Sequence, residues 1–420
     1  MTASRKYAVV IAGAGPAGLA TALHLLRNDP ALAGRIVALE KARHPRFKVC
    51  AGGLIPRAIA SLDELGLTLA VPAVEVFGGI ARTEAGPMDL GTSSRPLCTI
   101  VRRDQFDAML ADAARRAGLE IVEQAKVLAV EQGAQGVTVE SQRGAFEGQV
   151  LVGADGSGSR VRRSLFGRSG HNLGRALMAD VPIDAANAEE FVKRIYRFDF
   201  NCVRAGVHGY CWSFPCIVGG QPSLNLGIYE QFSSNRHVSG EAQADLPRLL
   251  HAAFPEFVLN HNGSVRTAYK AFPIRWYSTG DEYLRGRTIL AGDAAGVDPL
   301  MGEGISCALE HGKLAAAAIA SYLGGDAAAL DAYGKLLHKG LMGRKLRRLA
   351  FAARCFYGSH HQRYFRLAAL SRSAQKLGVD WYNGAGGADE ISIARAALRL
   401  LGMVMTRKAS DKDNGPFAQC

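Results

Sequence analysis

The sequence predicts an α/β fold, α+β overall, in which a parallel βαβ domain is interrupted by an antiparallel sheet and followed by helices. An apolar run over 7–12, a glycine turn, a helix through Leu26 and a second apolar run over 35–40 have the pattern of a βαβ unit. Short alternating runs rich in aromatic residues fill 173–278, as expected of antiparallel strands. Beyond Gly324-Gly325 the chain is basic and has helical periodicity.

The parallel domain is expected to be discontinuous, because its patterns return later in the chain. A helix over 103–118 leads to strands over 120–122 and 126–131, and buried strands recur at 149–153 and 287–291 before an Ala-rich helix over 304–323. In the intervening segment, strands are expected over 194–200, 210–215 and 223–229. We assign 1–75, 98–172 and 279–330 to a Rossmann-like domain, 76–97 and 173–278 to an antiparallel substrate domain, and 331–420 to a C-terminal helical region.

Composition favours a cytoplasmic globular protein. With 420 residues, 48% of them hydrophobic, the chain can bury a large core. Its eight cysteines form no C-x-x-C pair and have no His partner at metal-ligand spacing, so neither disulfides nor a metal site are expected. No uncharged run reaches membrane-spanning length.

The net charge of +12 is concentrated in one segment. Lys335–Lys376 holds eleven Lys or Arg and no Asp or Glu. Such a segment can face anionic lipid, a nucleic acid or an acidic partner protein, or it can be a solvated helix surface. We expect no specific nucleic-acid binding, and keep peripheral contact with the inner membrane face and an acidic partner protein as alternatives.

A glycine motif directly after the first strand predicts a dinucleotide site. The glycines permit a tight turn, close approach of a pyrophosphate and close helix–strand packing, while the helix N-terminus supplies partial positive charge. Glu40 follows the second strand, where its carboxylate can accept hydrogen bonds from ribose hydroxyls. The motif consists of Gly13, Ala14, Gly15, Pro16, Ala17 and Gly18.

Two later segments resemble the glutathione-reductase-like flavoproteins, a superfamily that includes aromatic hydroxylases, flavin-dependent halogenases and geranylgeranyl reductases. The segment 151–162, with Asp155-Gly156, is similar to that group's Asp-Gly motif, and 287–295 followed by Pro299 and 302–304 is similar to its second flavin motif. The resemblance implies FAD as cofactor, with Gly292-Asp293 binding the ribityl chain. The turn Gly302-Glu303-Gly304 would begin a helix whose N-terminus favours the reduced flavin anion.

Arg103 begins a helix that resembles the superfamily's Arg-x-x-Leu/Phe segment, which places an arginine near the FAD pyrophosphate; the alternative is a surface arginine. Lys41, Val127 and Ile305 complete the expected cofactor-binding set. No second Gly-x-Gly-x-x-Gly follows a strand. NAD(P)H or another electron donor is therefore expected to dock only transiently.

Two further segments are similar to signatures of the geranylgeranyl reductase family. Pro45–Leu54 resembles Pro-x-x-Lys-x-Cys-Gly-Gly, with Ala51 interrupting it, and Tyr210–Pro215 with Asn225-x-Gly227 resembles Tyr-x-Trp-x-Phe-Pro and Asn-x-Gly. This resemblance implies hydride transfer from reduced flavin to an isolated carbon–carbon double bond of an isoprenoid. A lipid or other apolar small molecule would then be the substrate.

The same signatures supply the candidate catalytic residues. Cys50, Gly52 and Gly53 are expected to form a loop near the reactive face of the flavin. Cys50 either tunes this site or donates a proton there, or it is a buried, inert cysteine. Tyr210 and Trp212 alternate with Phe214 on one strand face, and form either an apolar tunnel wall or aromatic core.

The basic helical segment Lys335–Lys376 has a possible role in membrane contact if the substrate is a lipid. Leu337, Leu341, Leu346, Leu349, Ala353 and Phe356 recur at helical spacing among basic residues. Such a stripe can rest on an anionic membrane or pack on the core. Further along the chain, 381–384 and a helix expected over 391–405 could close a substrate tunnel, and 410–420 has the composition of a polar tail.

The sequence is also compatible with two other functions. A monooxygenase or halogenase acting through a flavin hydroperoxide on an aromatic substrate would use the same fold, and its substrate could be a tryptophan of a partner protein. A flavin-bearing redox sensor without turnover is the third alternative.

Overall fold

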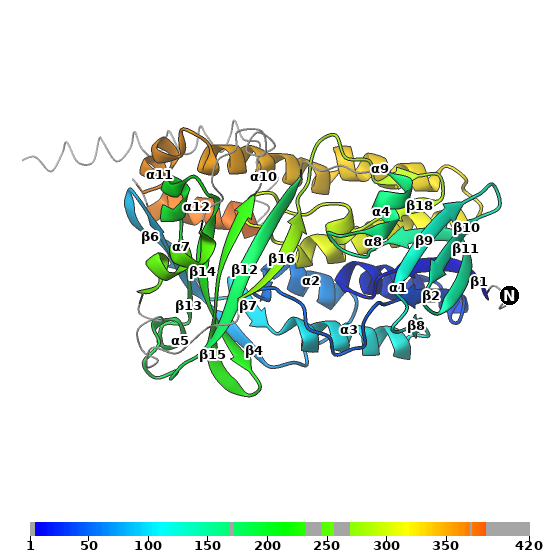
Figure 1. Ribbon diagram of the computed structural model, residues 1–420, viewed down its shortest axis with the longest axis horizontal. Helices are drawn as coiled ribbons and strands as arrows, with labels where there is room; N and C mark the ends of the chain where they lie inside the picture. Colours follow the sequence, from blue (N-terminus) through cyan, green and yellow to red (C-terminus); the bar gives the residue numbers. More distant parts are fainter. Residues whose placement is uncertain (1–4, 168–171, 232–244, 256–268, 370–371, 384–420) are drawn as a thin grey trace, which may run out of the picture.

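The computed structural model describes residues 5–167, 172–231, 245–255, 269–369 and 372–383. A parallel sheet with its helices forms one end of the molecule, and long twisted strands form the other (Figure 1). Helices α9 and α10 run along one edge toward α11. The helix expected over 391–405 and the tail over 410–420 lie outside the described residues.

The first sheet has the order β17-β18-β11-β1-β2-β8, with β10 joining β11 to β9. Its central pairs are parallel, while the pairs β10/β11, β9/β10 and β17/β18 are antiparallel. The strands are β1 (Arg5–Ala12), β2 (Ile36–Leu39), β8 (Glu120–Val122), β9 (Val127–Gln132), β10 (Val137–Ser141), β11 (Gly144–Gly153), β17 (Leu284–Arg285) and β18 (Thr288–Leu290).

Apolar helices accompany this sheet because its central strands are buried on both faces, as is usual for parallel sheets. Helix α1 is buried from Pro16 to Leu26, which explains why its sequence is apolar almost all round. The helices are α1 (Pro16–Asn28), α2 (Pro56–Glu64), α3 (Arg103–Arg116), α4 (Arg160–Leu165) and α8 (Ile305–Leu323).

The second sheet has the order β16-β12-β15-β14-β13-β5-β6. The antiparallel expectation holds except at one place, where β13 pairs in parallel with β5, a strand that comes from before α3 in the chain. A small sheet, β3-β7-β4, lies between the two. The strands are β3 (Gly53–Leu54), β4 (Ala73–Val76), β5 (Gly78–Thr83), β6 (Gly86–Thr92), β7 (Cys98–Val101), β12 (Leu173–Pro182), β13 (Ile195–Asp199), β14 (His208–Val218), β15 (Gln221–Gln231) and β16 (Lys270–Arg275), with short helices α5 (Glu189–Val192) and α7 (Leu246–Ala253).

The C-terminal region is helical, as predicted. Of the apolar stripe expected there, Leu337, Leu346, Leu349 and Ala353 are buried, so these positions pack on the core and do not face a membrane. Leu341 departs from the stripe, because 61% of it is exposed. The helices are α9 (Ala329–Lys339), α10 (Leu341–Tyr357), α11 (His361–Ala369) and α12 (Arg372–Asn383).

The fold class is confirmed, whereas the domain limits stay a prediction. Predicted elements appear with ends shifted by a few residues. The largest extensions are at β11, which already begins at Gly144, and at β14, which pairs with β15 along its whole length from His208↔Gln231 to Val218↔Gln221.

Strand register in the first sheet brings the predicted cofactor motifs together. Ala12 pairs with Leu39 and with Gly153, and Gly153 pairs with Leu290. The segments that follow these residues therefore leave the sheet side by side at the carboxyl ends of parallel strands, where ligands bind in open α/β sheets.

Candidate active site

One cavity of about 1330 Å³ runs from the carboxyl edge of the first sheet to the second sheet and the C-terminal helices. It exceeds the roughly 300–1,000 Å³ of a pocket for a single small ligand, so it has room for a cofactor and a substrate. The predicted residues that line it are Gly13, Gly15, Pro16, Ala17, Glu40, Lys41, Arg103, Val127, Asp155, Gly292, Asp293, Gly302, Gly304 and Ile305 of the cofactor set, and Cys50, Gly52, Gly53, Tyr210 and Trp212 of the catalytic set. The predicted residues Ala14, Gly18 and Pro299 lie behind its wall.

The turn between β1 and α1 forms a cradle that requires glycine. Gly13 has φ of +101°, and a Cβ there would lie 2.4 Å from the carbonyl oxygen of Ala154. Gly18 faces back onto the turn, where a Cβ would lie 2.1 Å from Gly13 O. The N-terminus of α1 consequently reaches the cavity with no side chain of the glycine turn in front of it, which is the arrangement that binds a diphosphate.

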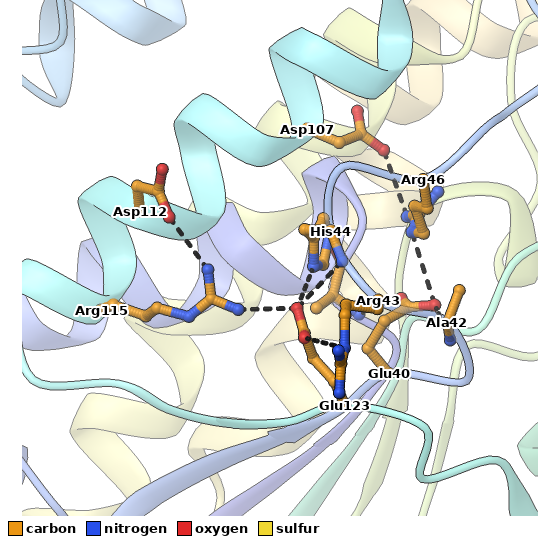
Figure 2. Close-up of polar contacts among 10 residues, drawn as sticks. Glu40, Ala42, Arg43, His44, Arg46, Asp107, Asp112, Arg115 and Glu123 are labelled. Atoms are coloured by element: carbon orange, nitrogen blue, oxygen red, sulfur yellow. Dashed lines mark hydrogen bonds and ion pairs between the residues drawn. The ribbon is translucent and has the colours of Figure 1, made fainter.

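Glu40 fixes this turn from the neighbouring strand. Its Oε2 accepts a hydrogen bond from Ala14 N (3.1 Å), and its Oε1 accepts one from Ala42 N (3.0 Å). Arg46 Nε lies 3.4 Å from Glu40 Oε1. Figure 2 shows Arg46 between Glu40 and Asp107 of α3, with Arg46 Nη2 3.1 Å from Asp107 Oδ2.

Arg46 is a functional candidate that was not singled out from the sequence. Its Nη2 lies 3.3 Å from the position that a Cβ on Gly15 would occupy, so the guanidinium stands directly over the glycine turn. A cation at this place suits a phosphate. Its position in the Pro-x-x-Lys-x-Cys signature was the available signal.

The loop carrying Arg46 is held from its other side by Glu123, which follows β8. Glu123 Oε1 accepts from His44 N (3.0 Å), lies 3.1 Å from His44 Nδ1 and pairs with Arg115 Nη2 (2.7 Å), as Figure 2 shows. These hydrogen bonds hold the pKa of Glu123 below its usual range, although partial burial opposes them. The network ties the loop to α3.

Arg103 belongs to the cavity wall and is not a surface arginine, since only 8% of it is exposed. Its guanidinium makes a bidentate pair with Asp107, with Nε–Oδ1 of 2.8 Å and Nη2–Oδ2 of 3.0 Å. Burial alone would lower the pKa of Arg103, but Asp107 and the neighbouring Cys50 raise it above its usual range. The guanidinium therefore stays charged beside the cofactor region.

Asp155 lines the cavity, but its carboxylate is used within the protein. It accepts from Ser159 Oγ (2.5 Å), Arg160 N (2.6 Å) and Val161 N (3.2 Å), which caps the first turn of α4. Burial raises the pKa of Asp155 and these bonds oppose the rise. What this segment offers a ligand is its backbone.

The second motif is anchored by a histidine of α8. Gly292 N donates to His311 Nδ1 at 2.9 Å, and burial lowers the pKa of His311 to about 4, so its ring is neutral and can accept. Asp293 lines the cavity, with Oδ1 3.2 Å from the position of a Cβ on Gly304. The carboxylate thus stands at the start of α8, where a polar chain could be bound.

Side chains from three regions hold the loop over 298–302, which borders the cavity. Tyr210 OH of β14 donates to Met301 O (2.5 Å), and Tyr357 OH of α10 donates to Leu300 O (2.6 Å). Gln231 Nε2 donates to Pro299 O, and Pro299 itself does not line the cavity. The second sheet and the C-terminal helices therefore position this loop together.

The Cys50 loop approaches the small sheet too closely for any residue but glycine. Gly52 has φ of +79°, and a Cβ there would lie 1.8 Å from Val101 O. Gly52 N donates to Cys50 Sγ at 3.3 Å. A Cβ on Gly53 would lie 3.0 Å from Cys98 Sγ and 3.6 Å from Phe214. Cys50 is half-buried on the cavity wall, with Arg103 beside it.

Lys48 is a second functional candidate that was not singled out from the sequence, although it belongs to the Pro-x-x-Lys-x-Cys-Gly-Gly signature. It lines the cavity, and its Nζ lies 3.2 Å from the centroid of the Phe272 ring. Burial lowers the pKa of Lys48 to about 8, and the nearby Asp293 carboxylate partly opposes this change. Its amine is accordingly able to hold or release a proton near neutral pH.

The polar atoms of the two predicted aromatic catalytic residues are occupied. Tyr210 OH is bonded to the loop, and Trp212 Nε1 donates to Asn225 Oδ1 at 2.8 Å. Asn225 Nδ2 in turn donates to Asp180 (2.7 Å). A Cβ on Gly227 would lie 2.1 Å from the Trp212 ring, so the Asn-x-Gly pair both orients the indole and leaves room for it.

A continuous aromatic wall leads from this loop to the C-terminal helices. Ring centroids lie 5.2 Å apart for Phe198 and Tyr210, and 5.7 Å apart for Phe200 and Phe365 of α11 and for Phe365 and Phe356 of α10. The alternatives of tunnel wall and aromatic core are both partly realised, because these rings are mostly buried yet line the cavity. The residues of the wall are Tyr196, Phe198, Phe200, Tyr210, Trp212, Phe214 and Phe356.

Exposed cavity residues fall into two groups. Phe47 (49% exposed) and Leu128 (42%) border the cavity beside the first sheet. Phe351 (44%), Tyr364 (38%) and Leu367 (37%) border it on α10 and α11. Helix α11 and strand β9 lie toward different ends of the molecule in Figure 1, so the two groups of exposed lining residues mark two ends of the cavity, which we call its first-sheet opening and its helical opening.

The residues present fit a flavin dinucleotide. The glycine cradle at the N-terminus of α1, with Arg46 over it, suits a diphosphate, and Asp293 at the start of α8 suits a ribityl chain. In the described residues no group of three or more His, Cys, Asp or Glu is arranged to hold a metal ion.

The profile of the family described as FAD binding domain matches residues 6–339. The chain belongs to this family of FAD-binding flavoproteins. It is an FAD-dependent oxidoreductase, and the predicted superfamily is confirmed. When bound, FAD supplies hydride or electron transfer, and the residues above would hold it.

Relatives of this flavoprotein catalyse different reactions. Menaquinone reductase of Mycobacterium tuberculosis is 30% identical over 330 residues, which cover 73% of this chain and 75% of that protein. The 3-hydroxybenzoate 6-hydroxylase of Klebsiella oxytoca is 27% identical over 347 residues, covering 77% and 82%. A geranylgeranyl bacteriochlorophyll reductase-like protein of Thermoplasma acidophilum has the same fold, with a TM-score of 0.70 at 20% identity, covering 98% of this chain and all of the other.

Proposed function

We propose that this flavoprotein reduces carbon–carbon double bonds of an isoprenoid or another long apolar substrate. The observation that carries the proposal is the single cavity that joins the cofactor motifs to the aromatic wall and continues to α10 and α11. A small aromatic substrate would need only the part of this wall near the cofactor. A long chain would use all of it.

Two of the wall residues, Tyr210 and Trp212, favour an apolar substrate because their polar atoms are already bonded. Tyr210 and Trp212 donate their hydrogen bonds to Met301 O and Asn225 Oδ1, so they offer ring faces to the cavity. Burying an isoprenoid chain against such faces is favourable at roughly 25 cal/mol per Å² of apolar surface. The wall would orient the double bond and exclude water from it.

Reduction of a double bond needs a hydride for one carbon and a proton for its neighbour. With FAD as hydride source, the chain must supply the proton. Lys48, whose pKa is about 8, and Cys50, with Gly52 N bonded to its sulfur, are side chains of the cavity that can hold it. We assign the proton to one of these two groups.

Relatives support a reductase of a lipid. Menaquinone reductase is 30% identical to this chain, and menaquinone carries an isoprenoid side chain. NAD(P)H is the electron donor we propose; it would dock transiently beside the first-sheet opening of the cavity.

A monooxygenase acting on an aromatic substrate is the alternative, and the hydroxylase relative favours it. Rapid mixing separates the two functions. The reduced holoprotein is mixed without oxygen with geranylgeranyl diphosphate, which has no quinone ring to accept electrons, and flavin absorbance is followed. Reoxidation by the substrate alone supports the reductase, whereas reoxidation that requires oxygen and is hastened by an aromatic substrate contradicts it.

A further inference from the structure

We propose that the exposed face of α10 and α11 docks on an anionic lipid bilayer and thereby places the helical opening of the cavity at the membrane surface. The choice of a lipid partner rests on the proposed function. We call this face the docking face; it consists of Leu341, Arg344, Phe351, Arg354, Arg363, Tyr364, Arg366 and Leu367.

Helix α10 presents arginines and apolar side chains together on its exposed side. Leu341, Arg344, Phe351 and Arg354 recur at spacings of three or of seven residues, so they lie along one side of the helix. All four are exposed, including 61% of Leu341 and 44% of Phe351. Its opposite side packs on the core, so the exposed apolar groups are additional to those needed for folding.

Helix α11 repeats this composition. Phe365 faces inward and is 1% exposed, whereas Tyr364 (38%) and Leu367 (37%) are exposed between Arg363 and Arg366. Aromatic and aliphatic groups among arginines are typical of helices that lie in the membrane interface. In the part of the chain that the structure describes, no helix is long and apolar enough to cross a membrane, so the contact we propose is peripheral.

The docking face also borders the cavity. Phe351, Tyr364 and Leu367 are exposed and at the same time line the cavity, next to Phe356 at the end of the aromatic wall. A lipid chain leaving the bilayer between α10 and α11 would meet this wall without crossing water. This continuity connects the surface to the cavity.

Charge complementarity selects an anionic surface as the partner. The segment Lys335–Lys376 has eleven basic residues and no acidic one. Two of the carboxylates beside α11 and α12 are already paired: Glu84 lies 3.1 Å from His361, and Asp380 lies 3.1 Å from Lys376. Each basic residue near an anionic bilayer strengthens the electrostatic attraction between the protein and the bilayer, and salt screens this attraction.

Vesicle flotation of the FAD-loaded full chain tests the proposal. We expect binding to vesicles of phosphatidylcholine mixed with phosphatidylglycerol, and weaker binding to phosphatidylcholine alone or at high salt. Arg344→Glu with Arg354→Glu should lower the partition coefficient about tenfold or more. Phe351→Glu with Leu367→Glu should lower it on the anionic vesicles as well.

Matched controls are Lys6→Glu and Val192→Glu, which change an exposed lysine and an exposed apolar residue elsewhere, and neither should alter binding. Retained flavin absorbance shows that each variant is folded. Equal binding to neutral and anionic vesicles, or binding unchanged in the docking-face variants, overturns the proposal. So does sedimentation velocity showing that the face joins two copies of the chain.

Vesicle binding is measured without turnover, so the two proposals fail separately. Anaerobic reduction of a detergent-dispersed isoprenoid without vesicle binding overturns only the docking proposal. Vesicle binding without any such reduction leaves the docking face and contradicts the proposed reaction.

Discussion

The hydroxyl of Tyr382 donates a 2.7 Å hydrogen bond to Asp298 Oδ2, which links α12 to the loop beside the cofactor. Asp298 also accepts from Leu300 N (2.6 Å) and Met301 N (3.2 Å), so one carboxylate shapes the loop and ties it to the C-terminal region. Burial raises the pKa of Asp298, while the bond from Tyr382 opposes this rise. The C-terminal helices are thus part of the active-site structure.

Tyr382→Phe should loosen this loop. Loss of a hydrogen bond to a buried carboxylate costs about 2 kcal/mol, and we expect faster FAD dissociation together with a lower free energy of unfolding. Tyr7→Phe is the matched control, because Tyr7 OH donates a bond of the same length (2.7 Å) to Glu120, far from the cavity. If both variants release FAD at the wild-type rate, Tyr382 does not hold the loop.

Asn225→Leu should disturb the aromatic wall. It leaves the buried indole N–H of Trp212 without its acceptor, while Asp180 keeps its ion pair with Arg102 (2.9 Å), and we expect a cost of about 2–3 kcal/mol. Gly227→Ala should cost about 3 kcal/mol because the new Cβ would overlap the indole ring. Urea unfolding measures both, and Gly280→Ala, where a Cβ meets nothing within 4 Å, should change stability by no more than about 0.5 kcal/mol.

Gly13→Ala should weaken FAD binding about tenfold or more, since a positive φ alone costs an L-residue about 1–2 kcal/mol and the Cβ would strike Ala154 O. The flavin-to-protein ratio after purification reports this directly. Gly158→Ala is the control: Gly158 also borders the cavity, but a Cβ there meets nothing within 4 Å. Equal flavin content in the two variants would refute the role of the cradle.

Lys48 should react with acetic anhydride at lower pH than an ordinary lysine. Only the neutral amine reacts, and a pKa of about 8 makes half of it neutral at that pH, whereas an unperturbed lysine titrates near 10.4. Labelling followed by mass spectrometry of the flavin-free protein should therefore show a midpoint near pH 8 for Lys48 and a higher one for a lysine model peptide treated in the same way. A common midpoint for both would show that Lys48 is not desolvated.

The convergence of the predicted cofactor motifs on one edge of the first sheet was predictable because it depends on local geometry. Gly13, Glu40 and Asp293 follow strands whose apolar runs are evident in the sequence. The parallel register of these strands then places the three residues at the same edge of the sheet. Arg46 and Lys48 were harder to identify, because their roles depend on Asp107 and Phe272, which are distant in sequence. A surface lysine and a buried one have the same appearance in a sequence.

The second sheet and the C-terminal helices show a different limit of prediction from the sequence. The parallel pairing of β13 with β5 is a long-range contact with no local signal. Leu337 and Phe351 belong to one basic, amphipathic segment, yet the first is buried and the second is exposed at the cavity rim. Periodicity indicates that a helix has an apolar side, but the number of partners on each side is decided by the tertiary fold.

The mass of the product tests the central claim most directly. The dithionite-reduced holoprotein is incubated without oxygen with geranylgeranyl diphosphate in D2O, and the recovered substrate is analysed by mass spectrometry. We predict that the isoprenoid gains two hydrogens for each double bond lost, and that both are deuterium, because dithionite supplies electrons only. An unchanged isoprenoid, together with gain of an oxygen atom by an aromatic substrate once air is admitted, would contradict the account.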